Sequence, residues 1–263
     1  MKKPDDGPLA VMIREAMALI DVGALFTDPV FYGVHVPPGD GKLVAILPGL
    51  FGSDSYLQPL HNWLRCMGYN PVRSTLTMNA GCMDDSREAV QLEIDRQLGG
   101  SRRPIALIGH SRGGTLAWSI AARMQERVSH LVMLGSPVPD YLRAVESKEV
   151  KIPLGPMTRI LLHASKFSRR MLDPNCRFPS CECAFVTDIE RPLSPATSLL
   201  AIYGRDDLVV PEAARLTAAE TIEVPASHVG LVYSPEVFRA LGRFLASDNS
   251  ARQSLLSPSA AAG

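Results

Sequence analysis

Short apolar runs alternate with amphipathic stretches along most of the chain. Gly, Pro or charged residues bound the runs, as is typical of buried strands, and the stretches between them repeat apolar residues at helical spacing. Buried strands that alternate with helices predict an α/β fold, in which a mostly parallel sheet carries helices on both faces. The expected strands are residues 42–47, 71–77 (the weakest), 104–109, 129–134, 198–203 and 221–224, and the expected helices are 56–68, 86–98, 237–245 and one through Ala117 and Ile120.

The same pattern separates a core from an N-terminal addition. Residues 9–20 carry an apolar stripe that includes Ile20, so residues 1–41 are interpreted as an amphipathic helix docked on the body of the protein, followed by a lead-in. The alternation places the core in residues 42–136 and 198–246. Because open parallel sheets bind ligands at the carboxyl ends of their strands, we expect the chemistry there.

Residues 137–197 interrupt the alternation. They are rich in proline and contain an apolar helical stretch around Ile160 and Leu161. A structureless loop of this length is unusual in a compact domain, so the segment is interpreted as a cap or lid inserted above the sheet. Residues 247–263 are rich in Ser and Ala and are expected to form a flexible tail.

The most specific chemical signal is the sequence Gly-His-Ser-Arg-Gly-Gly at residues 109–114. It directly follows an expected strand and opens an expected helix. That is the setting of a nucleophile elbow, a strained turn that holds a serine hydroxyl clear of the sheet. Small residues at positions 109 and 113 would let the strand and the helix approach. Ser111 is therefore the candidate nucleophile.

A serine needs a base to take its proton, and after an elbow of this kind the acid and then the histidine follow along the chain. Among the six histidines, His228 lies in a short loop between the strand 221–224 and the last helix. This position is at the edge of the sheet where Ser111 is expected. We predict that His228 is the base.

The acid that orients the histidine should follow the preceding strand. Asp206 and Asp207 both follow the strand 198–203, and either could orient the imidazole. Asp140 is a weaker third candidate.

A developing oxyanion needs N–H donors that are already in place. One is expected from Arg112, directly after the nucleophile, and the other from Leu50, in the loop after the first core strand. Phe51 in that loop, and Ile160 and Leu161 in the insertion, are expected to contact the substrate.

Several stretches together resemble the α/β-hydrolase superfamily, and more narrowly its lipase and esterase branches. A bacterial group of lipase-like hydrolases is especially similar, because Asn79 and Gly81 fit its N-x-G pattern, although Pro48 replaces the histidine that many lipases carry. In the family, the aspartate that lies three residues after a glycine and four before a proline is the triad acid, which favours Asp207. The matching stretches are LPGLFGS (47–53), LIGHSRGG (107–114), LGSP (134–137), IYGRDDLVVP (202–211) and SHVGLVYSPEV (227–237).

Charge and composition exclude several kinds of partner. Lys+Arg and Asp+Glu are equal at 27 each, so no global field favours nucleic acid or an anionic membrane surface. No apolar stretch is long enough for stable membrane insertion. Asp5 and Asp6 interrupt any secretory signal, so we expect a cytoplasmic location.

The five cysteines are expected to be free thiols in this compartment. Cys176, Cys181 and Cys183 cluster in the insertion, but a zinc site would need a fourth ligand, and the compartment argues against a disulfide. We expect no metal and no organic cofactor.

These features predict a serine hydrolase that cleaves carboxylic esters through an acyl-enzyme, with a small, hydrophobic ester or lipid-like molecule as its substrate. The same scaffold supports thioesterases, acyltransferases and binding proteins without turnover, and the fold alone does not choose among them.

Overall fold

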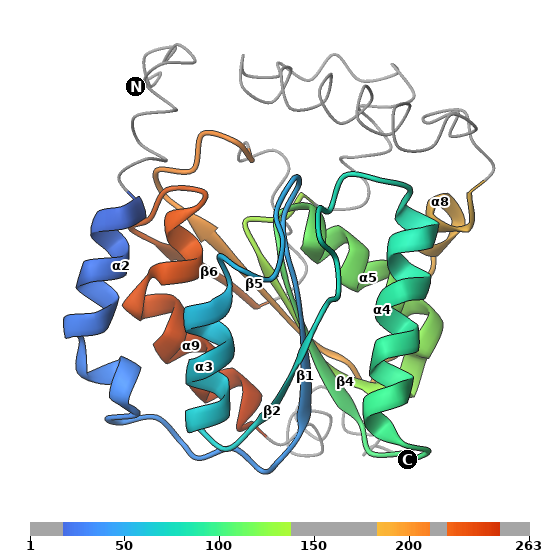
Figure 1. Ribbon diagram of the computed structural model, residues 1–263, viewed down its shortest axis with the longest axis horizontal. Coiled ribbons are helices and arrows are strands. Elements are labelled where there is room, and N and C mark those ends of the chain that lie inside the picture. Colours follow the sequence, from blue (N-terminus) through green and yellow to red (C-terminus); the bar gives the residue numbers. More distant parts are fainter. Residues whose placement is uncertain (1–17, 138–182, 211–219, 248–263) are drawn as a thin grey trace, which may run out of the picture.

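Six parallel strands form one sheet in the computed structural model, which describes residues 18–137, 183–210 and 220–247 (Figure 1). The strand order is β2-β1-β3-β4-β5-β6, so the chain starts near one edge and the sheet grows outward on both sides of β1. The strands are β1 Leu43–Leu47, β2 Asn70–Arg73, β3 Ile105–His110, β4 Val128–Leu134, β5 Ser198–Gly204 and β6 Glu220–Val224.

Helices cover both faces of this sheet, as the sequence predicts. On one face lie α2 (Ala18–Thr27), α3 (Gln58–Cys66) and α9 (Pro235–Leu245), and on the other α4 (Met83–Leu98), α5 (Arg112–Met124) and α8 (Ala184–Asp188) (Figure 1). The predicted α/β fold with a parallel sheet is confirmed. None of the helices in these described ranges combines the length and the apolar character needed to cross a bilayer.

The central strands are mostly apolar because both of their faces are buried. Along β1, Val44 and Ile46 point into one core layer, and Leu43, Ala45 and Leu47 point into the other. This explains why the strands appear in the sequence as continuous apolar runs instead of alternating ones.

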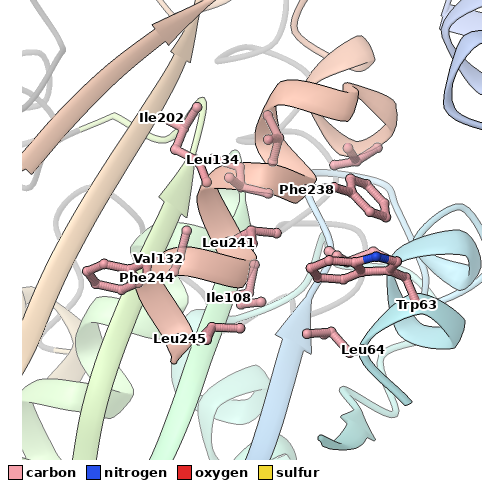
Figure 2. Packing of buried hydrophobic residues seen from close by; sticks show 14 of the residues in the cluster. Trp63, Leu64, Ile108, Val132, Leu134, Ile202, Phe238, Leu241, Phe244 and Leu245 are labelled. Carbon is pink, nitrogen blue, oxygen red and sulfur yellow. The ribbon is translucent and has the colours of Figure 1, made fainter. Parts of the chain in front are cut away.

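Aromatic side chains fill the layer beneath α3 and α9. The rings of Trp63 and Phe238 meet edge to face with centroids 4.9 Å apart, and the Trp63 indole N–H donates to the Val30 carbonyl over 2.9 Å (Figure 2). Such a pair adds about 1 kcal/mol to the apolar burial of its rings. This packing sets α9, and hence the loop before it, firmly against the sheet.

The predicted strand 71–77 is shorter than expected. β2 ends at Arg73, and the N–H groups of Ser74 and Thr75 donate to the carboxylate of Asp54 over 3.0 and 3.2 Å. Thr75 also adopts a positive φ of 62°, which is incompatible with a strand. A side chain about twenty residues away therefore ends this strand.

The N-terminal helix differs in part from its prediction. Most of the predicted range 9–20 lies outside the described residues, and α2 continues from Ala18 to Thr27. Leu25 of α2 is buried in the core, but Ile20 is 65% exposed. The apolar stripe therefore does not dock at Ile20, because the turn of α2 that faces the core lies nearer its carboxyl end.

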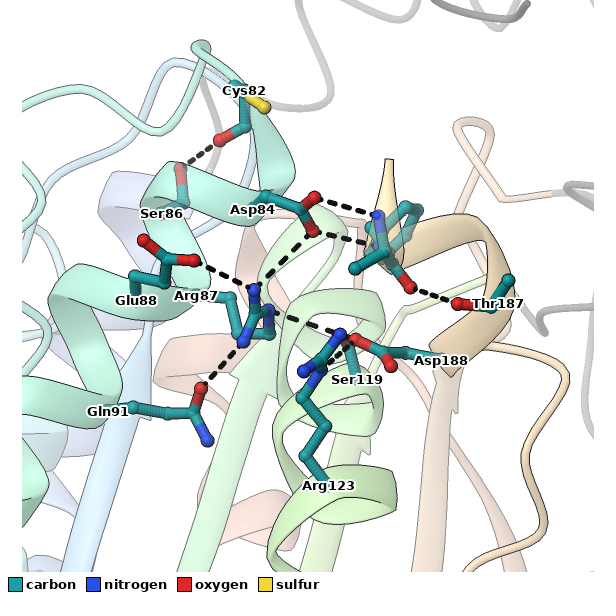
Figure 3. A network of polar contacts seen from close by, with 12 residues as sticks. Cys82, Asp84, Ser86, Arg87, Glu88, Gln91, Ser119, Arg123, Thr187 and Asp188 are labelled. Carbon is teal, nitrogen blue, oxygen red and sulfur yellow. Dashed lines mark hydrogen bonds and ion pairs between the residues drawn. The ribbon is translucent and has the colours of Figure 1, made fainter. Parts of the chain in front are cut away.

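Helix α8 was not predicted as a separate element, and it packs on the core. It lies within the stretch assigned to the insertion, yet Phe185 and Ile189 join the apolar layer beneath α4 and α5. Asp84, in the first turn of α4, accepts the N–H groups of Ala184 and Phe185 over 2.8 Å each and so caps α8 (Figure 3). The boundaries of the insertion stay a prediction, and Ile160 and Leu161 lie outside the described residues.

A buried ion cluster joins α8 to the two core helices. Asp188 is fully buried and accepts from the Ser119 hydroxyl over 2.8 Å and from Arg123 Nε over 2.6 Å (Figure 3). Arg87 of α4 lies 3.8 Å from the same carboxylate. Helix α8 is thus attached to α4 and α5 by ion pairs as well as by apolar contacts.

Candidate active site

Ser111 lies in a strained turn between β3 and α5. Its backbone has φ 54° and ψ −124°, a conformation that residues with a side chain rarely adopt. Its N–H donates to the Leu134 carbonyl over 2.8 Å, which ties the turn to the end of the neighbouring strand β4. Strain of this kind costs about 1–3 kcal/mol and persists where surrounding structure enforces it.

Glycines make this turn possible. A Cβ on Gly109 would overlap the Gly113 backbone, and a Cβ on Gly113 would overlap the Leu47 carbonyl at the end of β1. The strand, the turn and the helix are therefore in direct backbone contact. This is the physical reason for the small residues on either side of Ser111.

His228 and Asp207 form a buried hydrogen-bonded pair. The Nδ1 atom of His228 lies 2.8 Å from Asp207 Oδ2, and both residues are less than a tenth exposed. The other carboxylate oxygen accepts the N–H groups of Val209 and Val210 over 2.8 and 2.9 Å. Asp206, the alternative from the sequence, donates its backbone N–H to the Ala226 carbonyl instead.

The surroundings of Asp207 keep it ionised. Burial alone would raise its pKa, but the nearby His228, the hydrogen bond to it and the Val210 and Val209 donors outweigh burial and hold the pKa below its usual value. A carboxylate at Oδ2 accepts the Nδ1–H of His228, which leaves Nε2 of the imidazole as its basic atom.

Two glycines show how near these groups are to one another. A Cβ on Gly135, at the end of β4, would lie 3.2 Å from both Asp207 Oδ2 and His228 Nδ1. A Cβ on Gly49, after β1, would lie 3.2 Å from the Ser111 Cβ. The Ser111 N–H is hydrogen-bonded to Leu134, the residue before Gly135. The three predicted triad residues therefore lie at the same edge of the sheet, after the carboxyl ends of β3, β5 and β6.

The loop with Leu50 is held in place by Asn79. The Asn79 amide donates to the Pro48 carbonyl over 2.7 Å, and the Phe51 N–H donates to the Asn79 carbonyl over 3.1 Å. Leu50 is half-buried, and Phe51 is 42% exposed with a φ of 60°. Asn79 thus positions the loop in which the sequence places an oxyanion donor.

The Arg112 side chain stabilises the loop that contains Asn79. Its guanidinium donates to the carbonyls of Asn79 and Gly81 over 3.0 and 2.6 Å, and its Nε lies 3.0 Å from the sulfur of Met83. The buried charge therefore fastens the Asn79 loop to the first turn of α5. The backbone of Arg112 occupies the position after Ser111 at the start of that helix.

Sequence reasoning missed Tyr56 and set aside His110. The Tyr56 hydroxyl lies 2.6 Å from the Gly49 N–H and 2.9 Å from His110 Nδ1, and His110 Nε2 lies 3.0 Å from the His228 carbonyl. The presence of His110 inside the elbow sequence could have indicated a role near the site. Its partner Tyr56 could not be found in the same way, because it lies in a different part of the chain.

No three His, Cys, Asp or Glu side chains of the described ranges come together as a metal site would require. Cys66 and Cys82 are free thiols, whereas Cys176 and Cys181 fall in the part that the structure does not describe. The expectation of no cofactor stays a prediction.

Comparison with known proteins agrees with the observed fold. A family profile described as "alpha/beta hydrolase fold" matches residues 64–172. The DcsB structure, solved with a substrate analogue, superposes with a TM-score of 0.51 over 80% of this chain and 91% of that one, at 16% identity. The chain has the α/β-hydrolase fold.

Other known proteins match with a lower TM-score or over less of the chain. A monoacylglycerol lipase from Paleococcus ferrophilus has a TM-score of 0.49 at 17% identity, covering 80% of this chain and 96% of that one. Epoxide hydrolase 3 of Xenopus tropicalis is 45% identical over 47 residues, which are 18% of this chain and 12% of that protein. The family profile and the DcsB superposition support the fold. Proteins of this fold catalyse several types of reaction, so the reaction must be inferred from the residues at the site.

Proposed function

We propose that this α/β-hydrolase is a serine hydrolase that cleaves carboxylic esters, with Ser111 as nucleophile, His228 as base and Asp207 as the orienting acid. The observation that carries the proposal is the buried His228–Asp207 pair beside the strained Ser111 turn. A serine hydroxyl on a strained turn, together with an imidazole that a carboxylate orients, is the arrangement that acyl transfer requires.

In the first half-reaction, His228 Nε2 takes the proton of Ser111 while Oγ attacks the ester carbonyl. The N–H groups of Leu50 and Arg112 stabilise the oxyanion that forms, and Asp207 stabilises the charged imidazolium. Collapse of the tetrahedral intermediate breaks the bond to the alcohol oxygen, which receives the proton from His228. The acyl group is then an ester of Ser111.

The second half-reaction repeats these steps with water. His228 removes a proton from water as the oxygen attacks the acyl carbonyl, and the same N–H groups stabilise the second oxyanion. The bond to Ser111 Oγ then breaks, Oγ recovers its proton from His228, and the carboxylic acid leaves. This sequence needs no metal and no organic cofactor.

The acyl portion of the substrate is proposed to be hydrophobic. Phe51 exposes an aromatic ring on the loop that contains the Leu50 donor, and the apolar sequence around Ile160 and Leu161 supports contact with an acyl chain. Deletion of residues 150–170 should then change the preferred chain length. An unchanged preference would remove the insertion from this role.

The proposal is tested with p-nitrophenyl esters of two to sixteen carbons. We expect Ser111→Ala to lose at least about 10³-fold in kcat, whereas Ser101→Ala, at an exposed serine, should keep the native rate. A fluorophosphonate probe should label the native protein and not Ser111→Ala. A folded native protein that neither turns over these esters nor labels would refute the proposal.

A further inference from the structure

We propose that Tyr56 and His110 act together as positioning residues. They form a hydrogen-bonded link that fixes the position of Gly49, in the oxyanion loop, relative to the loop that contains His228. The inference rests on the proposed hydrolase function. It assigns roles to two residues outside the triad and the oxyanion donors, and it explains why a histidine precedes the nucleophile.

Three short hydrogen bonds make a continuous link. Gly49 N–H donates to the Tyr56 hydroxyl over 2.6 Å, the hydroxyl lies 2.9 Å from His110 Nδ1, and His110 Nε2 lies 3.0 Å from the His228 carbonyl. The rings pack as well, with centroids 5.8 Å apart for Tyr56 and His110 and 4.9 Å for His110 and His228. The link therefore joins Gly49, the residue before the proposed donor Leu50, to the backbone of His228, the proposed base.

The chemistry of the partners determines which atom donates and which accepts in each of these hydrogen bonds. The His228 carbonyl can only accept, so His110 Nε2 carries a hydrogen. Burial, together with the nearby His228, lowers the His110 pKa to about 3, so the ring is neutral and Nδ1 accepts the Tyr56 proton. The Tyr56 oxygen in turn accepts from Gly49. All three bonds are satisfied in one arrangement only.

Tyr56 is itself held at both ends. Its backbone carbonyl accepts the Tyr233 hydroxyl over 2.9 Å, from the turn (Gly230–Tyr233) that follows His228. The two loops are thus joined once through Tyr233 and once through His110. Because an oxyanion donor acts only when it is placed before the reaction, a small shift of Gly49 and Leu50 should slow chemistry more than it weakens binding.

The chain offers a matched pair of tyrosines for a test. Tyr56→Phe removes the hydroxyl that joins Gly49 to His110, and we expect kcat to fall about 10- to 100-fold with KM changed less than about twofold. Tyr69 has a buried hydroxyl with no hydrogen-bond partner among the described residues, so Tyr69→Phe should keep the native kcat. Rates are expressed per active site, counted with the fluorophosphonate probe, so that partial unfolding does not imitate the effect.

Two substitutions of His110 distinguish the effect of its hydrogen bonds from the effect of the volume that its ring fills. His110→Gln presents an acceptor and a donor with the same spacing as the two ring nitrogens, whereas His110→Leu presents neither. We expect His110→Gln to keep at least about five times the kcat of His110→Leu. Equal rates in the two variants would overturn the role of these hydrogen bonds.

A measurement without turnover tests the proton arrangement. Nitrogen-15 NMR of the native protein, with the His110 signals assigned by their loss in His110→Gln, should show hydrogen on Nε2 and none on Nδ1 from pH 8 to pH 5. The Tyr56→Phe variant should shift the Nδ1 signal, and Tyr69→Phe should not. A proton on Nδ1 in this range would overturn the link.

The outcomes also distinguish this inference from the proposed function. If the native protein hydrolyses esters, loses activity in Ser111→Ala and tolerates Tyr56→Phe, the link is wrong and the hydrolase proposal stands. If the native protein neither turns over nor labels, the hydrolase proposal fails, whatever the NMR shows.

Discussion

His228 Nδ1 lies 2.8 Å from Asp207 Oδ2, although 21 positions separate the two residues along the chain. Each follows a different strand, Asp207 after β5 and His228 after β6, and the pairing of these adjacent strands brings the two loops together. The carboxylate accepts two further backbone donors from its own turn, so it is rigidly placed. The imidazole is consequently oriented before any substrate binds.

The first prediction concerns this pair. Asp207→Asn should lower kcat about 10³- to 10⁴-fold, because an amide that donates to Nδ1 leaves the hydrogen of the imidazole on Nε2, the wrong tautomer for a base. Asp206→Asn is the matched control, since the described structure shows no side-chain hydrogen bond or ion pair for Asp206. The rates are measured with a p-nitrophenyl ester. Equal losses in both variants would contradict the assignment of the acid.

The second prediction concerns the strain stored at the nucleophile. Ser111→Gly should be more stable than Ser111→Ala by about 1 kcal/mol, because glycine adopts a φ of 54° without steric cost. Both variants lack the hydroxyl, so the comparison isolates the backbone. Urea unfolding at neutral pH measures the difference in the free energy of unfolding. An alanine variant that is more stable than the glycine variant by about 0.4–1 kcal/mol, the stabilisation expected from the lower entropy of its unfolded chain, would mean that the turn stores no strain.

The third prediction concerns the pH dependence of stability. Burial lowers the His110 pKa to about 3 from an ordinary 6.5, so below pH 6.5 the unfolded chain binds a proton that the folded protein does not. His110 should therefore remove about 2 kcal/mol of stability as the pH falls from 7 to 5. Urea unfolding at both values should show a smaller loss in His110→Gln than in the native protein.

The control for that experiment is His35→Asn, at an exposed position, which should lose as much stability as the native protein. If His110→Gln also loses the native amount, His110 is charged in the folded protein at pH 5. Its link to Tyr56 would then need a different arrangement of protons.

The fourth prediction concerns the ion cluster beneath α8. Asp188→Asn should lower the free energy of unfolding by about 1.5–3 kcal/mol, because it removes the carboxylate that Arg123 contacts at 2.6 Å and one of the three carboxylates near the buried Arg87 (Figure 3). Asp95→Asn breaks an exposed pair with Arg127 and should cost less than about 1 kcal/mol. Thermal or urea unfolding distinguishes them. Similar costs would show that the buried cluster is not important for stability.

Much of the fold could be predicted because its signals are local. The apolar runs at residues 42–47, 104–109 and 198–203 became β1, β3 and β5 with only small changes at their ends. A strand buried on both faces must be apolar throughout, whatever its neighbours are. The Ser111 turn was also predictable, because its glycines and its place between strand and helix are local features.

Other features depended on contacts between distant parts of the chain. The end of β2 is determined by the carboxylate of Asp54, and the position of α8 by Asp84 and Arg123. No periodicity in the sequence encodes such contacts.

The sequence by itself determined the order of strands and helices along the chain, the elbow, and the candidate residues Ser111, His228 and the pair Asp206 and Asp207. Only the tertiary structure decided that Asp207, and not Asp206, contacts the imidazole. It also decided that the Arg112 guanidinium donates to the Asn79 carbonyl and that the Tyr56 hydroxyl contacts His110. The physical reason is that hydrogen-bond partners are chosen by distance and direction in space. Those quantities arise only when the sheet has brought its loops together.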